Sequence, residues 1–397
     1  MAAGIPGLTW SPSVTNLLVV PKSMIQEGYT PPPLGLLNVA AMDNGTYIID
    51  NANEPTLDVV SVFKYVSPRI VGVPIYTAGR VEALRLLKAA KEAGAITVAG
   101  GPHVSIMHAQ LAVHYPFIDH LVVGDGELAW KEITGGGKTP RVLKMRVPHF
   151  DSLPIPAWNR INVQRYPARG TGVHRGNDLG VIPRISVVFG RGCIGACGFC
   201  STWHLNGAYR NYGLEWTKRN LTELWKNGVR HLMWQDDCLT ANREGTMGLC
   251  KLLTQFGFSS IGVTRADCMD DEMAKALADA GFYEISFGLE SGSEYILKKM
   301  NKKADLGASF KARESLKKAG IIFTALMVCG YPYETDQTRR ETAEFLQKLN
   351  AEKVCSVGYT MVMPGTALYI ECKRAGLIND DFWLGEEPYY VYRGGLT

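Results

Sequence analysis

The chain has 397 residues, of which 46% are hydrophobic and 20% charged, an ordinary composition for globular domains. Its 42 basic and 38 acidic residues leave a net charge of +4 without a long basic run, so nucleic acid is not an expected partner. No apolar run reaches the ~18 residues of a membrane span, and the first residues lack the pattern of a signal peptide. We therefore expect a cytoplasmic protein that does not contact a membrane.

The first part of the chain, residues 1–140, alternates short apolar strands with helical patterns. The expected strands cover residues 16–20, 45–50, 69–75, 95–99 and 120–123. The clearest helix covers residues 80–93, with Val81, Leu84 and Leu87 spaced for one face. This alternation predicts a doubly wound, Rossmann-like parallel sheet.

Residues 141–182 are rich in Pro, Gly and Arg and show little periodicity, which predicts a linker. Alternation resumes over residues 183–385, and residues 386–397 form a short C-terminal tail. The expected strands cover 185–189, 231–234, 260–263, 284–288, 321–328 and 354–363, and the expected helices 214–226, 272–280, 306–319 and 335–349. Six strand–helix units predict a partial (β/α)6 TIM barrel, with its chemistry at the C-terminal ends of the strands.

Three of the nine cysteines lie on one glycine-rich loop, directly after the first barrel strand. Cys193, Cys197 and Cys200 have the spacing C-x3-C-x2-C, which is unlike a framework of paired disulfides. Three thiolates can ligate three irons of a [4Fe–4S] cluster and leave the fourth iron without a protein ligand. That iron can bind the amino and carboxylate groups of S-adenosylmethionine (SAM). We expect most of the other six cysteines to be small buried hydrophobes.

A zinc site is the alternative for this loop. His204 follows Cys200 closely, so the three cysteines and this histidine could form a Cys3His tetrahedron. Structural zinc sites usually divide their ligands between two loops, whereas these four residues share one. The lysines at 298, 299, 302 and 303 are expected to lie on a solvated face.

Several further segments of the barrel resemble segments of one known enzyme family. They are Gln235-Asp236-Asp237, Ile285–Ser293 with Leu297–Lys302, Cys329–Thr335 and Pro364-Gly365-Thr366. Together with the cysteine spacing, they make residues 183–385 resemble the radical SAM enzymes that carry a cobalamin (B12)-binding domain.

The resemblance implies roles for the barrel residues in binding SAM. Phe199 would lie beside the adenine, and Arg265 would face the carboxylate. Gln235, Asp236 or Asp237 would contact the amino group or the ribose, and Glu290 and Ser291 would reach the ribose hydroxyls. The Gly-Gly-Glu that the family usually carries after the second strand is absent, so the amino-group contact stays open. Carboxylates at strand ends can instead cap the next helix.

The loops after the N-terminal strands also match the family in order. The matching residues are Asn51, Asn53, Tyr76, Thr77, Gly100, Gly101, His103, Gly124, Gly126 and Glu127. Open α/β sheets bind ligands at this edge, and the resemblance implies cobalamin there. The Asp-x-His-x-x-Gly motif is absent, which predicts binding without a histidine ligand from that motif. Alternatively, the domain binds nothing or another nucleotide.

The family implies a cobalamin-dependent methyltransferase that acts through a 5′-deoxyadenosyl radical on an unactivated carbon or phosphorus centre. Its partners would be a small-molecule or peptide substrate and a reductant such as flavodoxin or ferredoxin. A cyclase or rearrangement enzyme is an alternative. A methylthiotransferase would need further cluster cysteines near the N-terminus, and residues 1–192 contain none. A zinc- or corrin-binding regulatory module is the non-enzyme alternative.

Overall fold

The computed structural model describes residues 16–22, 31–169, 173–174, 177–178 and 181–396. The chain forms two compact units, one built mainly from Gly35–Val147 and the other mainly from Asn162–Thr397. Within the described ranges, every helix is too short or too polar to cross a membrane.

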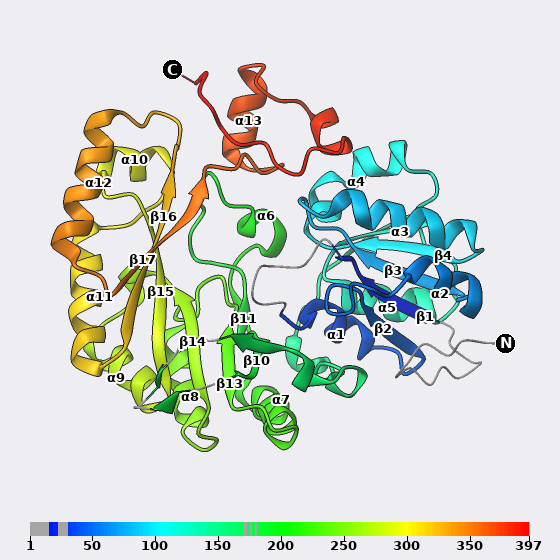
Figure 1. The fold of residues 1–397 in the computed structure, drawn as a ribbon, viewed down its shortest axis with the longest axis horizontal. Helices are drawn as coiled ribbons and strands as arrows, with labels where there is room; N and C mark the ends of the chain where they lie inside the picture. Colours follow the sequence, from blue (N-terminus) through cyan, green and yellow to red (C-terminus); the bar gives the residue numbers. More distant parts are fainter. Residues whose placement is uncertain (1–15, 23–30, 170–172, 175–176, 179–180, 397) are drawn as a thin grey trace. The chain divides into compact units, whose positions relative to one another are not determined.

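The first unit has a six-stranded parallel sheet in the order β2-β1-β3-β4-β5-β6, with helices on both of its faces (Figure 1). The strands are β1 (Asn16–Val20), β2 (Thr46–Asp50), β3 (Ile70–Pro74), β4 (Ile96–Gly100), β5 (His120–Gly124) and β6 (Val142–Met145). The helices are α1 (Leu34–Ala40), α2 (Val59–Val66), α3 (Arg80–Glu92), α4 (Pro102–His114) and α5 (Gly126–Thr134). All five residues of β1 are buried, as expected for a central strand covered on both faces. The predicted doubly wound sheet is confirmed.

The second unit has a seven-stranded sheet in the order β17-β16-β15-β14-β13-β10-β7. Its strands are β7 (Pro167–Arg169), β10 (Val181–Val187), β13 (His231–Trp234), β14 (Ser259–Thr264), β15 (Phe282–Glu290), β16 (Ile322–Cys329) and β17 (Lys353–Tyr359). The six strands from β10 to β17 run parallel, and β7 pairs antiparallel with β10. These six strands confirm the predicted partial barrel, with β17 and β7 as the two edges of the sheet.

Helices of the second unit pack on the outer side of this curved sheet (Figure 1). They are α7 (Leu214–Lys226), α8 (Arg243–Leu253), α9 (Asp271–Asp279), α10 (Glu294–Lys299), α11 (Leu306–Ala319) and α12 (Asp336–Leu349). Near the C-terminal strand ends lie α6 (Thr202–Asn206), α13 (Ala367–Arg374) and the ribbon of β11 (Gly190–Arg191) with β12 (Arg210–Asn211). The short pair β8 (Val173–His174) and β9 (Asn177–Asp178) is separate. Short 3₁₀ turns cover Phe150–Ser152, Trp158–Arg160, Val163–Arg165, Ala266–Cys268 and Asp380–Leu384.

The stretch 141–182, predicted as a linker, contains more regular structure than its composition indicates. Its first residues form β6, which extends the sheet of the first unit. The following segment packs against α7, where Trp158 Nε1 donates to Asn220 Oδ1 over 2.7 Å and Trp216 Nε1 donates to the Leu153 carbonyl over 2.9 Å. Two indole hydrogen bonds hold this proline-rich segment, and they leave no periodic pattern in the sequence.

Gly72 has no room for a side chain in the middle of β3. A Cβ atom there would lie 2.6 Å from Leu18 Cδ2 and 2.8 Å from Trp130 Cζ3. We predict that Gly72→Ala lowers the free energy of unfolding by about 1–3 kcal/mol, because the packed core must shift. Gly35→Ala in α1 is the matched control, since a Cβ there meets no atom within 4 Å. Urea unfolding of both variants tests this, and equal stability of the two would contradict it.

Candidate active site on the cysteine loop

The cysteine loop leaves the C-terminal end of β10 and returns through a short antiparallel ribbon. Pairing of Gly190 with Asn211 and of Arg191 with Arg210 closes the loop at its base. Gly192 has φ +96°, and a Cβ there would lie 2.9 Å from the carbonyl oxygens of Gly207 and Ala208. The glycines around Cys193 are therefore needed for the tight base of the loop.

Two of the cysteine sulfurs lie close to Gly195. A Cβ atom on Gly195 would be 3.7 Å from Cys193 Sγ, 3.8 Å from Cys197 Sγ and 2.9 Å from Arg265 Nη1. The Gly195 amide also donates to Cys193 Sγ over 3.3 Å. All three loop cysteines are free and half-buried. The missing side chain at Gly195 thus leaves space between two thiols and a guanidinium.

The far side of the loop is fixed to α13 and to the segment after α10. The Gly198 amide donates to the Met300 carbonyl over 2.7 Å, and the Leu368 amide donates to the Gly198 carbonyl over 2.9 Å. Asn301 Nδ2 donates to the Ala196 carbonyl over 2.8 Å. These bonds hold the loop backbone from both directions, so its cysteines are presented by a fixed scaffold.

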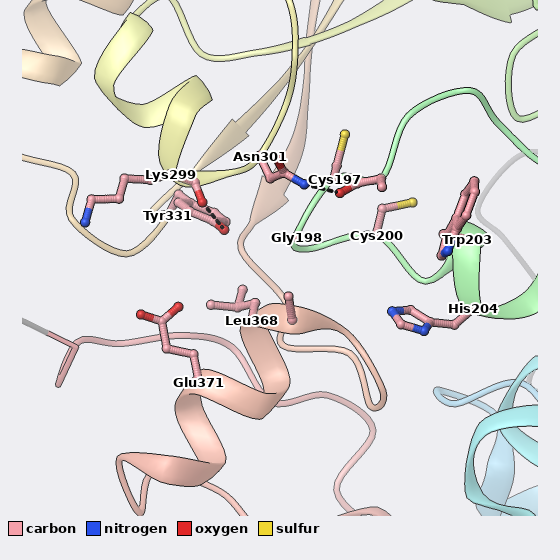
Figure 2. A pocket seen from close by; sticks show the side chains of 12 residues that line it. Cys197, Gly198, Cys200, Trp203, His204, Lys299, Asn301, Tyr331, Leu368 and Glu371 are labelled. Carbon is pink, nitrogen blue, oxygen red and sulfur yellow. Dashed lines mark hydrogen bonds between the residues drawn. The ribbon is translucent and has the colours of Figure 1, made fainter. Parts of the chain in front are cut away.

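A pocket of about 150 Å³ borders this side of the loop (Figure 2). Its lining consists of Ala196, Cys197, Gly198, Cys200, Trp203, His204, Lys299, Asn301, Tyr331, Ala367, Leu368 and Glu371. His204 therefore lies near two of the cysteines, as the zinc alternative requires. Within the described parts of the chain, however, no three His, Cys, Asp or Glu side chains converge as ligands of one metal ion.

The arrangement suits a cubane cluster, because each of its three thiolate ligands binds a different iron and the sulfurs need not converge on one point. Burial raises the pKa of the Cys197 thiol, while Lys302 and Arg265 act to lower it. A hydrogen bond with Cys238, followed by burial, raises the pKa of Cys193. Metal binding must therefore drive the loss of these protons, which makes cluster assembly pH-dependent.

Asp236 and Asp237, predicted as SAM contacts, bind the loop backbone. Buried Asp236 accepts hydrogen bonds from the amides of Phe189, at 3.1 Å, and Gly190, at 2.6 Å. Asp237 accepts from the Gly192 amide over 2.9 Å, and from Thr202 and Asn206 at 3.0 and 3.1 Å. The two carboxylates hold both ends of the cysteine loop, while their contact with SAM stays a prediction.

Asp236 gives the metal-free protein a characteristic pH dependence. Burial, only partly offset by its backbone hydrogen bonds, raises the pKa of this carboxyl from 3.8 to about 7. Between pH 3.8 and about 7, the folded state keeps a proton on Asp236 that the unfolded state has released. This proton stabilises the folded state fully below pH 3.8, and the stabilisation is lost as the pH rises to about 7. We predict that the stability of the wild type, relative to Asp236→Asn, falls by up to ~1.4 kcal/mol per pH unit over this window.

Urea unfolding of the metal-free wild type and of Asp236→Asn at pH 5, 6 and 7 measures this difference. The variant is the matched control, because its amide does not titrate. A difference that stays constant or grows with pH would contradict the assignment.

The other predicted SAM residues lie around the same strand ends. Phe199 makes an edge contact with Tyr331, with ring centroids 6.3 Å apart, and Gln235 is exposed directly after β13. Arg265 makes two bonds to Asp267, at 2.9 and 2.6 Å, and donates to the Lys303 carbonyl over 2.7 Å. Its guanidinium also borders Gly195, so one side of it faces the thiols.

Glu290 is the last residue of β15, and Ser291 follows it. Glu290 has φ +67°, and its Oε1 lies 3.0 Å from the Nζ of Lys302 in a buried ion pair. Ser291 is buried, with its hydroxyl 3.2 Å from that of Thr342 on α12. The expectation that the lysines from 298 to 303 all lie on a solvated face is wrong for Lys302, which is 8% exposed. Its pairing with Glu290 compensates the burial of both charges.

In the first unit, the predicted cobalamin residues gather at the C-terminal edge of the sheet. Thr77 follows β3 and His103 lies in the first turn of α4. Both side chains are buried, and His103 Nδ1 lies 3.2 Å from Thr77 Oγ1. Gly101 and Gly124 have φ +93° and +90°. A Cβ at Gly124 would lie 2.3 Å from the Met145 carbonyl oxygen. These positions require glycine for the turns of the chain itself.

The remaining predicted residues of this edge have local roles. Asn51 Nδ2 donates to the carbonyls of Glu54 and Leu57, each over 3.0 Å, and the Asn53 amide donates to Asp50 Oδ1 over 3.2 Å. Glu127 is buried in the first turn of α5. The others follow their strands as expected: Tyr76 after β3, Gly100 at the end of β4 and Gly126 at the start of α5. Their contact with a cofactor stays a prediction.

Several residues of this region were not predicted from sequence. Lys302 forms an ion pair with Glu290, and Asp267 forms one with Arg265. Asn301 donates a hydrogen bond to the Ala196 carbonyl. Of the six other cysteines, Cys238, Cys250 and Cys372 are buried, Cys268 is half-buried, and Cys329 and Cys355 are exposed. The expectation that most of these six are buried is therefore wrong for half of them.

Two sequence families match the two units. Residues 187–346 match the Radical SAM superfamily, and residues 24–134 match the B12 binding domain. The chain belongs to the radical SAM enzymes that carry a B12-binding domain. In this family, the cysteine loop at the end of β10 is the expected place of radical initiation.

Relatives of this radical SAM enzyme span most of its length. An uncharacterised methyltransferase of Pyrococcus horikoshii is 28% identical, covering 89% of this chain and 82% of the relative. The anaerobic magnesium-protoporphyrin IX monomethyl ester cyclase of Rubrivivax gelatinosus is 26% identical, and the match covers 74% of this chain and 56% of the cyclase. The radical SAM methyltransferase TsrM from Kitasatospora setae, solved with cobalamin and a [4Fe–4S] cluster, has the same fold, with a TM-score of 0.72. Its sequence is 16% identical, and the match covers 92% of this chain and 78% of TsrM.

Proposed function

We propose that this radical SAM enzyme is a cobalamin-dependent methyltransferase that acts on an unactivated carbon or phosphorus centre. The observation that carries the proposal is the C-x3-C-x2-C loop at the C-terminal end of β10, held by Asp236 and Asp237, in a chain that also has a B12-binding domain. The Pyrococcus horikoshii relative, of which this match covers 82%, is named a methyltransferase and supports the reaction class.

Cys193, Cys197 and Cys200 would hold a [4Fe–4S] cluster. When bound, the cluster supplies the electron that splits SAM into methionine and a 5′-deoxyadenosyl radical, and cobalamin carries the methyl group. Arg265 contributes a fixed positive charge beside the thiols, since Asp267 orients its guanidinium. This charge would favour the SAM carboxylate and offset the negative charge of the thiolates.

The edge of the first sheet would hold cobalamin. The chain turns at Gly101 after β4 and at Gly124 at the end of β5, where positive φ angles favour glycine, and the corrin ring would approach these loops. His103 hydrogen-bonds Thr77 within this edge. It would therefore support the loops and need not bind cobalt.

The test uses anaerobically reconstituted protein with cobalamin, a low-potential reductant and SAM carrying a labelled methyl group. A methyltransferase is expected to release S-adenosylhomocysteine and to leave the label with the corrinoid before any substrate is added. 5′-Deoxyadenosine should rise when a substrate is supplied. Release of 5′-deoxyadenosine without any transfer of label would overturn methyl transfer and favour a cyclase.

The cyclase alternative has a specific observation in its favour, since the Rubrivivax gelatinosus cyclase matches across both units. That relative is much longer, and this chain spans about half of it. The non-enzyme alternative predicts stoichiometric zinc without iron, and no products from SAM. We further propose that the enzyme acts in the cytoplasm on a small-molecule or peptide substrate, with a flavodoxin or ferredoxin as reductant.

A further inference from the structure

Asn301 ends α10 in a left-handed backbone conformation, with φ +50°. Its amide donates to the Lys298 carbonyl over 3.0 Å, and the amide of Lys302 donates to the Leu297 carbonyl over 2.9 Å. This pair of bonds is the Schellman ending of a helix, in which the left-handed residue is usually glycine. Four other helices of the second unit, α7, α9, α11 and α13, are followed closely by a glycine with positive φ: Gly228, Gly281, Gly320 and Gly376. Glycine would suffice for this turn, so the side chain of Asn301 is available for another contact.

The side chain of Asn301 reaches the cysteine loop. Its Nδ2 donates to the Ala196 carbonyl over 2.8 Å, and Figure 2 shows this bond as a dashed line. The carbonyl of Met300, the residue before Asn301, accepts from the Gly198 amide over 2.7 Å. Two consecutive residues after α10 therefore hold the loop backbone on both sides of Cys197.

The bond from Asn301 fixes the orientation of the peptide group between Ala196 and Cys197. The carbonyl of this peptide faces Asn301, and no peptide bond in the described ranges is cis. In a trans peptide the C=O and N–H groups point in opposite directions, so the Cys197 amide points away from Asn301. Within the parts of the chain that the structure describes, this amide donates to no protein group. Since Cys197 is half-buried, its amide needs an acceptor that is not part of the protein.

A cluster on this loop would provide such acceptors, because its sulfurs can accept hydrogen bonds. Hydrogen bonds to the sulfurs help to set the reduction potential of an iron–sulfur cluster, and they favour the reduced, more negative state. We propose that Asn301 is a positioning residue that turns the Cys197 amide toward the cluster and thereby raises the reduction potential of the cluster. The proposal rests on the proposed function, because it requires a [4Fe–4S] cluster on the cysteine loop. Asn301 acts through the Ala196 peptide rather than on the reacting atoms.

The test compares the reconstituted wild type with Asn301→Gly in redox titrations followed by electron paramagnetic resonance. Glycine suits the left-handed backbone, so the end of α10 should keep its fold while the bond to Ala196 is lost. The midpoint potential should become more negative, so that the ratio of reduced to oxidised cluster at a fixed potential falls about two- to tenfold, the range for one hydrogen bond.

Asn350→Gly is the matched control. Asn350 ends α12 with φ +48°, and its side chain makes no hydrogen bond within the described residues. This variant removes the same side chain from the same backbone conformation, far along the chain from the cysteine loop, and its midpoint potential should equal that of the wild type.

A second measurement detects the hydrogen bond itself. Proton hyperfine spectra of the reduced cluster in H2O and D2O should show one exchangeable coupling that is weakened or lost in Asn301→Gly and retained in Asn350→Gly. A wild-type potential together with wild-type couplings in Asn301→Gly would overturn this proposal and leave the proposed function standing. If the wild type assembles no [4Fe–4S] cluster, the proposed function itself fails.

Discussion

Replacing Cys197 with alanine is expected to reduce 5′-deoxyadenosine formation to background and to lower the iron content from about four atoms per chain to well below one. Cys197 is the middle one of the three proposed ligands, and its sulfur lies near Gly195, as does that of Cys193. Two thiolates cannot hold the cluster with one open iron, so both readouts should fall together. Iron analysis and product chromatography after anaerobic reconstitution measure them.

Cys193→Ala and Cys200→Ala should behave in the same way, while Cys250→Ala should keep its iron and its activity. The control is matched because Cys250 is also a free cysteine, buried on α8. Full iron content in any single loop variant would show that its cysteine is not a ligand.

The buried ion pair of Glu290 and Lys302 is expected to have the largest effect on stability. Their side chains are 11% and 7% exposed, and Glu290 Oε1 also occupies the space that a Cβ on Gly288 would need. Lys302→Met leaves Glu290 buried without its partner, which should lower the free energy of unfolding by about 3–5 kcal/mol. Urea unfolding followed by circular dichroism measures this loss.

The double variant Lys302→Met with Glu290→Gln should regain much of the lost stability, because it removes both charges. Lys318→Met is the control on the exposed pair with Asp271, where the side chains are 65% and 63% exposed and little change in stability is expected. A double variant as unstable as Lys302→Met would mean that the charge of Glu290 is not the cause.

The sheets and the cysteine loop could be predicted from sequence because their signals are local. The buried strands are short apolar runs such as Asn16–Val20, and the three cysteines follow one such run at fixed spacing. By contrast, β6 follows three glycines closely and contains Lys144, so its four residues resemble a loop. Its place in the sheet depends on pairing with β5, which is a tertiary contact.

Electrostatic partners could not be predicted in the same way. Lys302 stands among polar residues, and only the fold brings it to Glu290, twelve residues earlier. The family resemblance implied that Asp236 and Asp237 contact SAM, whereas in the structure their oxygens accept hydrogen bonds from amides of the cysteine loop. Those bonds depend on the path of the loop between Phe189 and Gly192, which the sequence pattern does not encode.

Binding of SAM to the one iron without a protein ligand is measured most directly by electron paramagnetic resonance of the reduced, reconstituted protein. A [4Fe–4S]⁺ signal whose g values change when SAM is added is the predicted result. A spectrum unaffected by SAM, or a protein that retains stoichiometric zinc and no iron after reconstitution, would contradict it.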